Sequence, residues 1–169
     1  MNVTETDRLT LRWMTVEDAG MVLELLNDPD WLRYIGDRGV RTLEAAQEYI
    51  LTGTVDMYNR LGFGLYLTER KPDGVPMGIC GLVKRDFLED VDLGFAFLPA
   101  FRTQGYAREA AAAVMEYARD TLGLRRLVAI TSLDNERSGR LLEKLGFRLE
   151  GNIPVPPGGK EARLFVADL

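Results

Sequence analysis

The chain has 169 residues, 46% of them hydrophobic and 28% charged, so we expect one soluble globular domain that spans residues 1–169. It contains no histidine and a single cysteine, which excludes histidine-dependent nucleophilic catalysis, histidine-ligated metal sites, internal disulfides and Cys-x-x-Cys pairs. The net charge of −5 argues against a nucleic-acid partner, and the sequence contains neither a membrane-spanning apolar stretch nor a signal peptide.

The N-terminal third predicts one strand followed by two helices. Residues 4–13 alternate between polar and apolar side chains, which is typical of a half-buried strand. The Thr15–Asp18 pattern of a capping box opens a helix, and the Asn-Asp-Pro-Asp run at 27–30 ends it. Residues 43–58 predict a second helix, in which Gly53 is a weak point.

The middle of the chain predicts β-structure. Strands are expected over residues 63–70, 77–85 and 91–98, and the turn at 71–74 makes a hairpin of the first two. The single thiol, Cys80, lies in an apolar run and is expected to be a buried strand residue rather than a reactive group. A reducing, cytoplasmic location fits this cysteine usage.

The C-terminal part alternates helices with strands. Apolar residues at spacings of three and four predict a helix over 105–122, followed by a strand at 126–131 and a short helix at 134–145. Two final strands are expected at 147–150 and 162–166. The sequence therefore predicts a mixed α/β domain with hairpins first and a strand-helix-strand unit at its centre.

A glycine-containing loop over residues 102–107 connects the strand ending near residue 98 directly to a helix. Its free backbone N–H groups and the helix dipole would suit a pyrophosphate, although a simple tight connection is the alternative. The loop is neither a P-loop nor a dinucleotide fingerprint. Residues 101–148 carry nine Lys and Arg against six Asp and Glu, which favours a local anionic ligand; solvated helix faces are the alternative.

The loop resembles the Gln/Arg-x-x-Gly-x-Gly/Ala signature of the GNAT (GCN5-related N-acetyltransferase) superfamily. The matching residues are Arg102, Thr103, Gln104, Gly105, Tyr106 and Ala107. Asn135-x-x-Ser138 and the segment 141–147 resemble the family's next block. Residues 6–19 resemble the opening of the branch that contains the RimJ/RimL-type ribosomal-protein N-terminal acetyltransferases, so the resemblance covers about residues 5–152.

This resemblance implies a single-domain GNAT fold, in which a mixed, mostly antiparallel sheet contains a central, splayed parallel strand pair flanked by helices. Acetyl-CoA would be the co-substrate, and no metal is needed. Its pantetheine arm would pair with main-chain groups of Phe95 and Phe97, one of which would also be an oxyanion donor. Backbone N–H groups of 102–107 would hold the pyrophosphate, and Asn135 would touch the pantetheine.

The resemblance also implies direct attack of a primary amine on the thioester in a ternary complex, without an acyl-enzyme. Ser138 is the expected hydrogen-bond donor to the sulfur, because Leu142 stands where many family members place a tyrosine; a helix-start role is its alternative. Asp92 is the expected base, acting through water, with a solvated strand charge as its alternative. Thr103 replaces a usual glycine, and Glu109 is expected to complement the helix dipole.

Further side chains have weaker claims to the site. The segment that shapes the acceptor cleft in this family contains Trp31, Tyr34 and Tyr58, although such aromatics are more often core residues. Arg137, Arg140 and Lys144 could reach the 3′-phosphate of coenzyme A or be surface charges.

Several acceptors and roles remain open at this stage. The branch precedent favours a protein or peptide N-terminal α-amine, and the close alternative is a small amine such as a polyamine, an antibiotic or an amino acid. A catalytically silent, CoA-binding sensor is the alternative from a different class. No nucleic-acid or membrane partner is expected, and a homodimer would agree with the frequency of dimers among relatives.

Overall fold

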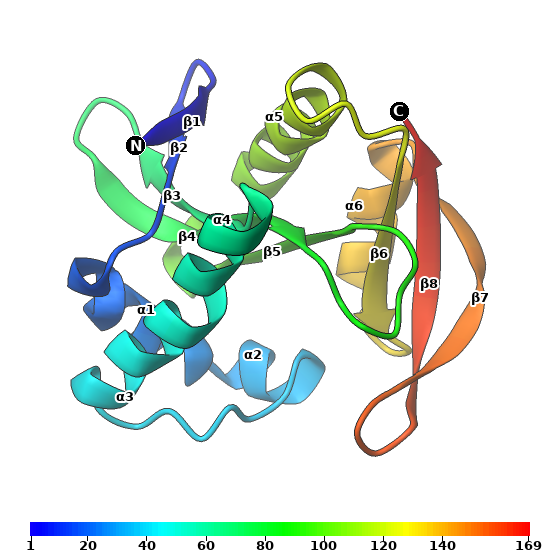
Figure 1. The fold of residues 1–169 in the computed structure, drawn as a ribbon, viewed down its shortest axis with the longest axis horizontal. Coiled ribbons are helices and arrows are strands. Elements are labelled where there is room, and N and C mark those ends of the chain that lie inside the picture. Colours follow the sequence, from blue (N-terminus) through cyan, green and yellow to red (C-terminus); the bar gives the residue numbers. More distant parts are fainter.

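One eight-stranded sheet runs through the whole chain in the computed structural model, which describes residues 1–169 (Figure 1). The strand order is β1-β2-β3-β4-β5-β6-β8-β7, and only the pair β5–β6 is parallel. The strands are β1 (Asn2–Glu5), β2 (Leu9–Arg12), β3 (Leu65–Arg70), β4 (Val75–Val83), β5 (Asp92–Phe97), β6 (Arg126–Ser132), β7 (Arg148–Val155) and β8 (Lys160–Asp168). This topology confirms the predicted fold class.

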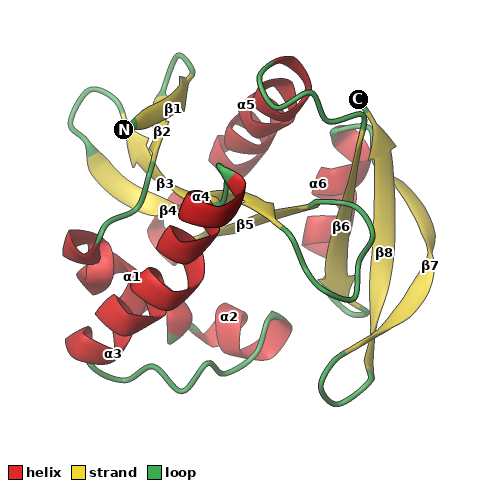
Figure 2. Ribbon diagram, in the orientation of Figure 1, coloured by secondary structure: helices red, strands yellow, loops and turns green.

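Helices cover the two faces of the sheet unequally. They are α1 (Ala19–Leu26), α2 (Pro29–Tyr34), α3 (Leu43–Tyr49), α4 (Asp56–Leu61), α5 (Tyr106–Asp120) and α6 (Glu136–Lys144). Figure 2 shows α4 in front of β4 and β5, α1 and α3 below these strands in the view, and α5 and α6 behind the sheet. The front face of β6, β8 and β7 carries no helix, and only the β4–β5 loop crosses it. None of the helices combines the length and apolarity that a membrane span requires.

The N-terminal region differs from the sequence prediction in two respects. The predicted strand at residues 4–13 is a hairpin of β1 and β2, closed by a hydrogen bond from the Thr6 N–H to the Leu9 carbonyl at 2.9 Å. Helix α2 was not predicted; it begins at Pro29, and Asp28 caps it by accepting from the Asp30 N–H. Proline suits the first helical position because no intrahelical bond is lost there.

The helix predicted at residues 43–58 is present, but it is interrupted by a π-helical segment. Thr42 caps α3, and the chain then continues as a π-helical turn over Ile50–Val55 before α4. Gly53 lies within this wider turn. Such turns occur often at functional sites, and this one borders the largest cavity of the molecule.

The core explains why the sheet and helices pack in this way. Thirty-three buried residues form one cluster between the sheet and the helices on both sides. Cys80 is among them, so the predicted buried thiol is confirmed, and burial raises its pKa well above the usual range. The capping box is also confirmed, because the Asp18 carboxylate accepts from the Thr15 N–H at 2.8 Å.

Candidate active site

The main cavity opens where β5 and β6 separate. The two strands pair only at Asp92 and Val128, where the Val128 N–H donates to the Val91 carbonyl at 2.9 Å, and they diverge towards their C-terminal ends. The resulting cavity has a volume of about 1580 Å³ and reaches from the starts of α5 and α6 to α2 and the π-helical turn. A parallel pair that opens in this way leaves unpaired main-chain groups, which an inserted extended ligand can use.

Backbone alternation decides which groups face this opening. The Leu98 N–H donates to Met77 of β4 at 2.9 Å, so the even-numbered residues of β5 bond towards β4. The main chains of Phe95 and Phe97 therefore point towards β6, into the cavity that both residues line. This placement agrees with the pantetheine prediction, with the N–H of Phe97 as its free group because the Phe97 carbonyl already accepts from Arg102 Nε at 3.0 Å.

The loop before α5 adopts a conformation suited to an anion. Thr103 and Gly105 have φ values of 62° and 83°, in the left-handed region, and such turns aim successive N–H groups into a concavity. The first turn of α5 adds its own unpaired N–H groups and its dipole. Five of the six predicted loop residues line the cavity, whereas Gln104 points away and donates from Nε2 to the Ala100 carbonyl at 2.8 Å.

Arg102 has partners that the sequence did not reveal. Its guanidinium donates to Asp28 at 2.5 Å, to Asp30 at 3.0 Å and to the Phe97 carbonyl at 3.0 Å. Its side chain thus ties the loop to the start of α2, which forms one wall of the cavity. Arg102 can offer its main chain to an anion, while its side chain fixes the wall beside it.

A second arginine, in the N-terminal hairpin, also holds the loop in place. Arg8 donates to Glu109 at 2.9 Å and to the Gln104 carbonyl at 3.1 Å, and its guanidinium lies 4.3 Å from the centre of the Tyr106 ring. Burial raises the pKa of Glu109, but the bonds from Thr6 and Arg8 outweigh it and hold that pKa below its usual range. Glu109 therefore anchors the loop to the N-terminal hairpin in addition to complementing the helix dipole.

Asp92 lies at the base of the opening and is only 2% exposed. One carboxylate oxygen accepts from Arg85 Nε at 2.7 Å, and the other has no partner in the protein. Burial raises its pKa to about 6, although the charge and hydrogen bond of Arg85 oppose that rise. A carboxylate with such a pKa is mostly ionised at neutral pH and can accept a proton.

The start of α6 forms the opposite wall. Asn135 caps this helix by accepting from the Ser138 N–H at 3.3 Å, and both residues line the cavity. The Ser138 hydroxyl makes no hydrogen bond within the protein, so it is available to a ligand. Leu142 is 1% exposed and belongs to the core, so this position supplies no polar group to the site.

The acceptor side is formed by elements that sequence reasoning only partly identified. Trp31 and Tyr34 of α2 line the cavity, whereas Tyr58 is a core residue whose hydroxyl donates to the Leu65 carbonyl and accepts from the Met14 N–H. Residues of the π-helical turn also line it, which no local pattern had indicated. On β5, a Cβ at Gly94 would meet only Leu65, at 3.5 Å, so packing does not demand a glycine there.

The basic side chains of α6 follow the outer rim. Those that line the cavity are Arg137, Arg140 and Lys144. Arg140 also lies 3.5 Å from Glu136, in an exposed pair that contributes little to stability. They remain candidates for a phosphate contact.

Comparisons with known proteins agree on one family. The family model described as "Acetyltransferase (GNAT) domain" matches residues 8–148. YoaA of Bacillus subtilis, an uncharacterized N-acetyltransferase, is 30% identical over 151 residues, which cover 88% of this chain and 84% of YoaA. YnaD of the same organism, also an uncharacterized N-acetyltransferase, is 30% identical over 162 residues, which cover 95% of this chain and 91% of YnaD.

Solved structures show the same fold. A GNAT-family acetyltransferase from Bordetella pertussis superposes with a TM-score of 0.81 at 25% identity, covering 99% of both chains. RimL, a ribosomal-protein α-N-acetyltransferase solved with coenzyme A, superposes with a TM-score of 0.85 at 17% identity, covering 100% of this chain and 98% of RimL.

Proposed function

The chain belongs to the GNAT acetyltransferase family, and on that premise we propose that it transfers the acetyl group of acetyl-CoA to the N-terminal α-amine of a protein or peptide. The observation that carries this proposal is the buried carboxylate of Asp92 at the base of the opening between β5 and β6. Asp92 lines the main cavity together with Val83, its partner in the β4 ladder.

The residues around the opening fit acetyl-CoA. GNAT enzymes use this co-substrate, which supplies the activated acetyl group as a thioester. The main chains of Phe95 and Phe97 would hold the pantetheine arm, and the N–H groups of the loop 102–107 would hold the pyrophosphate. Asn135 would contact the arm from the other wall. Gln104 would contribute through its main chain only, because its side chain points away.

The chemistry requires two proton movements. The acceptor ammonium must lose a proton before its nitrogen can form a bond to the carbonyl carbon, and Asp92 would take that proton through a water molecule. A main-chain N–H of β5 would stabilise the negative charge that develops on the carbonyl oxygen. As the carbon–sulfur bond breaks, the nitrogen would lose its second proton to form the neutral amide, and the leaving thiolate would take up one proton, so that coenzyme A departs as the thiol. The Ser138 hydroxyl would donate a hydrogen bond to the sulfur during this step.

The proton chemistry favours an α-amine over a lysine amine as acceptor. An α-amine has a pKa of about 8 and a lysine amine one of about 10.4, so a base with a pKa of about 6 is better matched to the α-amine. The structural similarity to RimL, which is described as an α-N-protein acetyltransferase, supports the same choice. A small amine is the second candidate, since a chimera of the spermidine N-acetyltransferase SpeG from Vibrio cholerae and hSSAT is also similar, with a TM-score of 0.76 at 17% identity over 95% of both chains.

A mass-spectrometric screen tests the proposal. Acetyl-CoA and the protein are incubated with a pool of N-terminal peptides of basic proteins, polyamines, aminoglycosides and amino acids. Acetylated peptide α-amines are the expected product. Acetylation of small amines alone would replace the proposed acceptor, and coenzyme A binding without any transfer would indicate a sensor.

Ser138→Ala is expected to lower kcat by about 10- to 100-fold, because the leaving sulfur would lose its donor. The affinity for acetyl-CoA should change little, since the Asn135 cap uses the backbone N–H of Ser138 and not its hydroxyl. Steady-state kinetics and calorimetric titration measure the two effects. Ser138→Thr, which keeps a hydroxyl, should retain most of the activity; an unchanged kcat in Ser138→Ala would remove Ser138 from the mechanism.

A further inference from the structure

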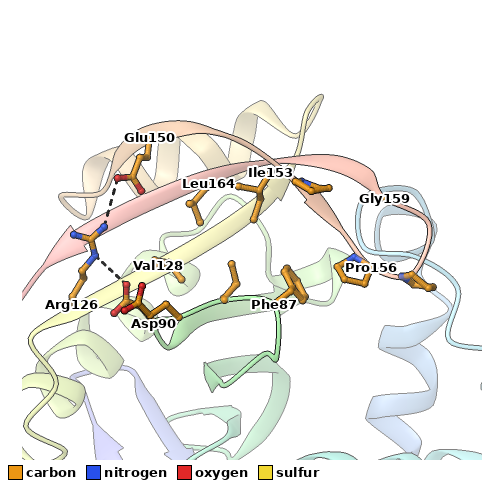
Figure 3. A pocket seen from close by; sticks show the side chains of 13 residues that line it. Phe87, Asp90, Arg126, Val128, Glu150, Ile153, Pro156, Gly159 and Leu164 are labelled. Atoms are coloured by element: carbon orange, nitrogen blue, oxygen red, sulfur yellow. Dashed lines mark ion pairs between the residues drawn. The ribbon is translucent and has the colours of Figure 1, made fainter.

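A second cavity, of about 600 Å³, lies on the face of the sheet that no helix covers (Figure 3). It is bounded by the β4–β5 loop on one side and by β6, β8 and β7 on the other. Its apolar lining includes Val128, Ile153 and Leu164 from the strands and Phe87 from the loop. These side chains belong to a small apolar cluster that is separate from the main core. The groove is therefore an apolar surface that the fold leaves partly open.

The groove is continuous with the proposed active site. Phe87, Pro156 and Pro157 line both this groove and the main cavity. In Figure 3, Phe87 and Pro156 lie towards one end of the groove, and the charged side chains lie at the other end. β7 follows the groove from Glu150 to the hairpin at Pro156, which corresponds to about 20 Å for six residues of extended chain. A chain that leaves the main cavity could follow it for about six residues.

The far end of the groove has an excess of negative charge. Arg126 lies 3.2 Å from Asp90 and 3.7 Å from Glu150, and Glu89 also lines this end. This end therefore carries three carboxylates against one guanidinium, and the Glu150 side chain is still 51% exposed. A lysine or arginine side chain of a bound chain would be attracted there.

We infer that this groove binds the polypeptide segment that follows the acetylated N-terminus of the acceptor, with apolar residues along the groove and a basic residue near its far end. The inference rests on the proposed function, because it takes the acceptor to be a polypeptide.

An extended peptide chain suits the groove better than the edge strand of a second copy of this protein. Pro154 and the bulge between Leu149 and Gly151 on β7 disfavour the edge pairing that would join two copies.

Peptide length and charge provide the test. Three synthetic peptides with N-terminal alanine are compared. The first is a tripeptide. The second, the lysine peptide, has ten residues, with apolar residues and proline at positions 3–5 and lysine at positions 7 and 8, and the third, the glutamate peptide, differs from it only in having glutamate at positions 7 and 8. The lysine peptide is expected to have a kcat/KM at least tenfold above that of the tripeptide. The glutamate peptide should be at least fivefold poorer than the lysine peptide.

Two variants locate the effect in the groove. Ile153→Lys should lower kcat/KM for the lysine peptide at least fivefold and leave the tripeptide unchanged. Leu149→Lys is the matched control, because this residue lies on the same strand, is 54% exposed and does not line the groove. Glu150→Lys, a change at an exposed position, should remove or reverse the preference for lysine over glutamate.

Each contrary result has a distinct meaning. Equal kcat/KM values for the tripeptide and the lysine peptide would overturn the inference and leave the proposed function intact. An equal loss of kcat/KM for both peptides in Ile153→Lys would have the same meaning. Acetylation of small amines without any peptide product would overturn both. A dimer in sedimentation experiments that Ile153→Lys dissociates would assign the groove to contacts between copies and overturn the inference.

Discussion

Asp92→Asn is expected to lower kcat by about 10²- to 10⁴-fold, the range that a positioned general base contributes. Asparagine keeps the size of the side chain but cannot accept the proton of the acceptor ammonium. In the wild type, kcat/KM should fall as the pH drops below about 6, because Asp92 of the free enzyme becomes protonated there. The variant should lack this acid limb. Steady-state rates between pH 5 and 9 measure both effects.

The stability of the same variant separates catalysis from folding. The folded-state pKa of Asp92 is raised to about 6, above the value of about 3.9 in an unfolded chain, so ionisation costs stability as the pH rises from about 4 through 6. That cost is complete above pH 6, is at most about 3 kcal/mol, and is absent in Asp92→Asn. The variant should therefore unfold at the same or a higher temperature than the wild type at pH 8, with no such gain at pH 4.

The control for this prediction is Asp86→Asn, which changes an exposed acid of the β4–β5 loop. It should keep both the activity and the acid limb. A wild-type level of activity in Asp92→Asn would mean that water alone removes the proton. An inactive Asp92→Asn variant with a lowered unfolding temperature would indicate a structural role.

Gly105→Val is expected to weaken acetyl-CoA binding more than 100-fold. Gly105 has a φ of 83°, where an L-residue costs about 1–2 kcal/mol and a β-branched one more. The added Cβ would also lie 3.3 Å from the guanidinium of Arg8, which holds Glu109 and the Gln104 carbonyl. The loop would change conformation, and its N–H groups would no longer point towards one binding position.

Gly123→Val is the matched control. Gly123 has a φ of 68°, nothing lies within 4 Å of the position that a Cβ would take, and it follows the opposite end of α5. The variant should lose a similar amount of stability and keep its affinity. Calorimetric titration, together with the thermal shift that acetyl-CoA produces, distinguishes the two variants. Equal affinities in both would contradict the assignment of the loop.

Local patterns determined most of the secondary structure. The capping box at Thr15–Asp18, the 3.6-residue period of α5 and the turn at 71–74 are signals between residues a few positions apart, so one sequence suffices to find them. The β1–β2 hairpin was missed because its turn contains neither glycine nor proline. Helix α2 was missed because it has six residues and depends on Arg102, more than seventy positions away.

The sequence by itself also determined the family, because the loop 102–107 and the segment 135–147 carry its motifs in short, contiguous stretches. Only the tertiary structure decided how the site works. The raised pKa of Asp92 depends on exclusion of water by surrounding strands, and the support of the loop depends on Arg8, about a hundred residues away from Glu109. The groove beside β7 exists because no helix covers that face, and such an absence leaves no pattern in the chain.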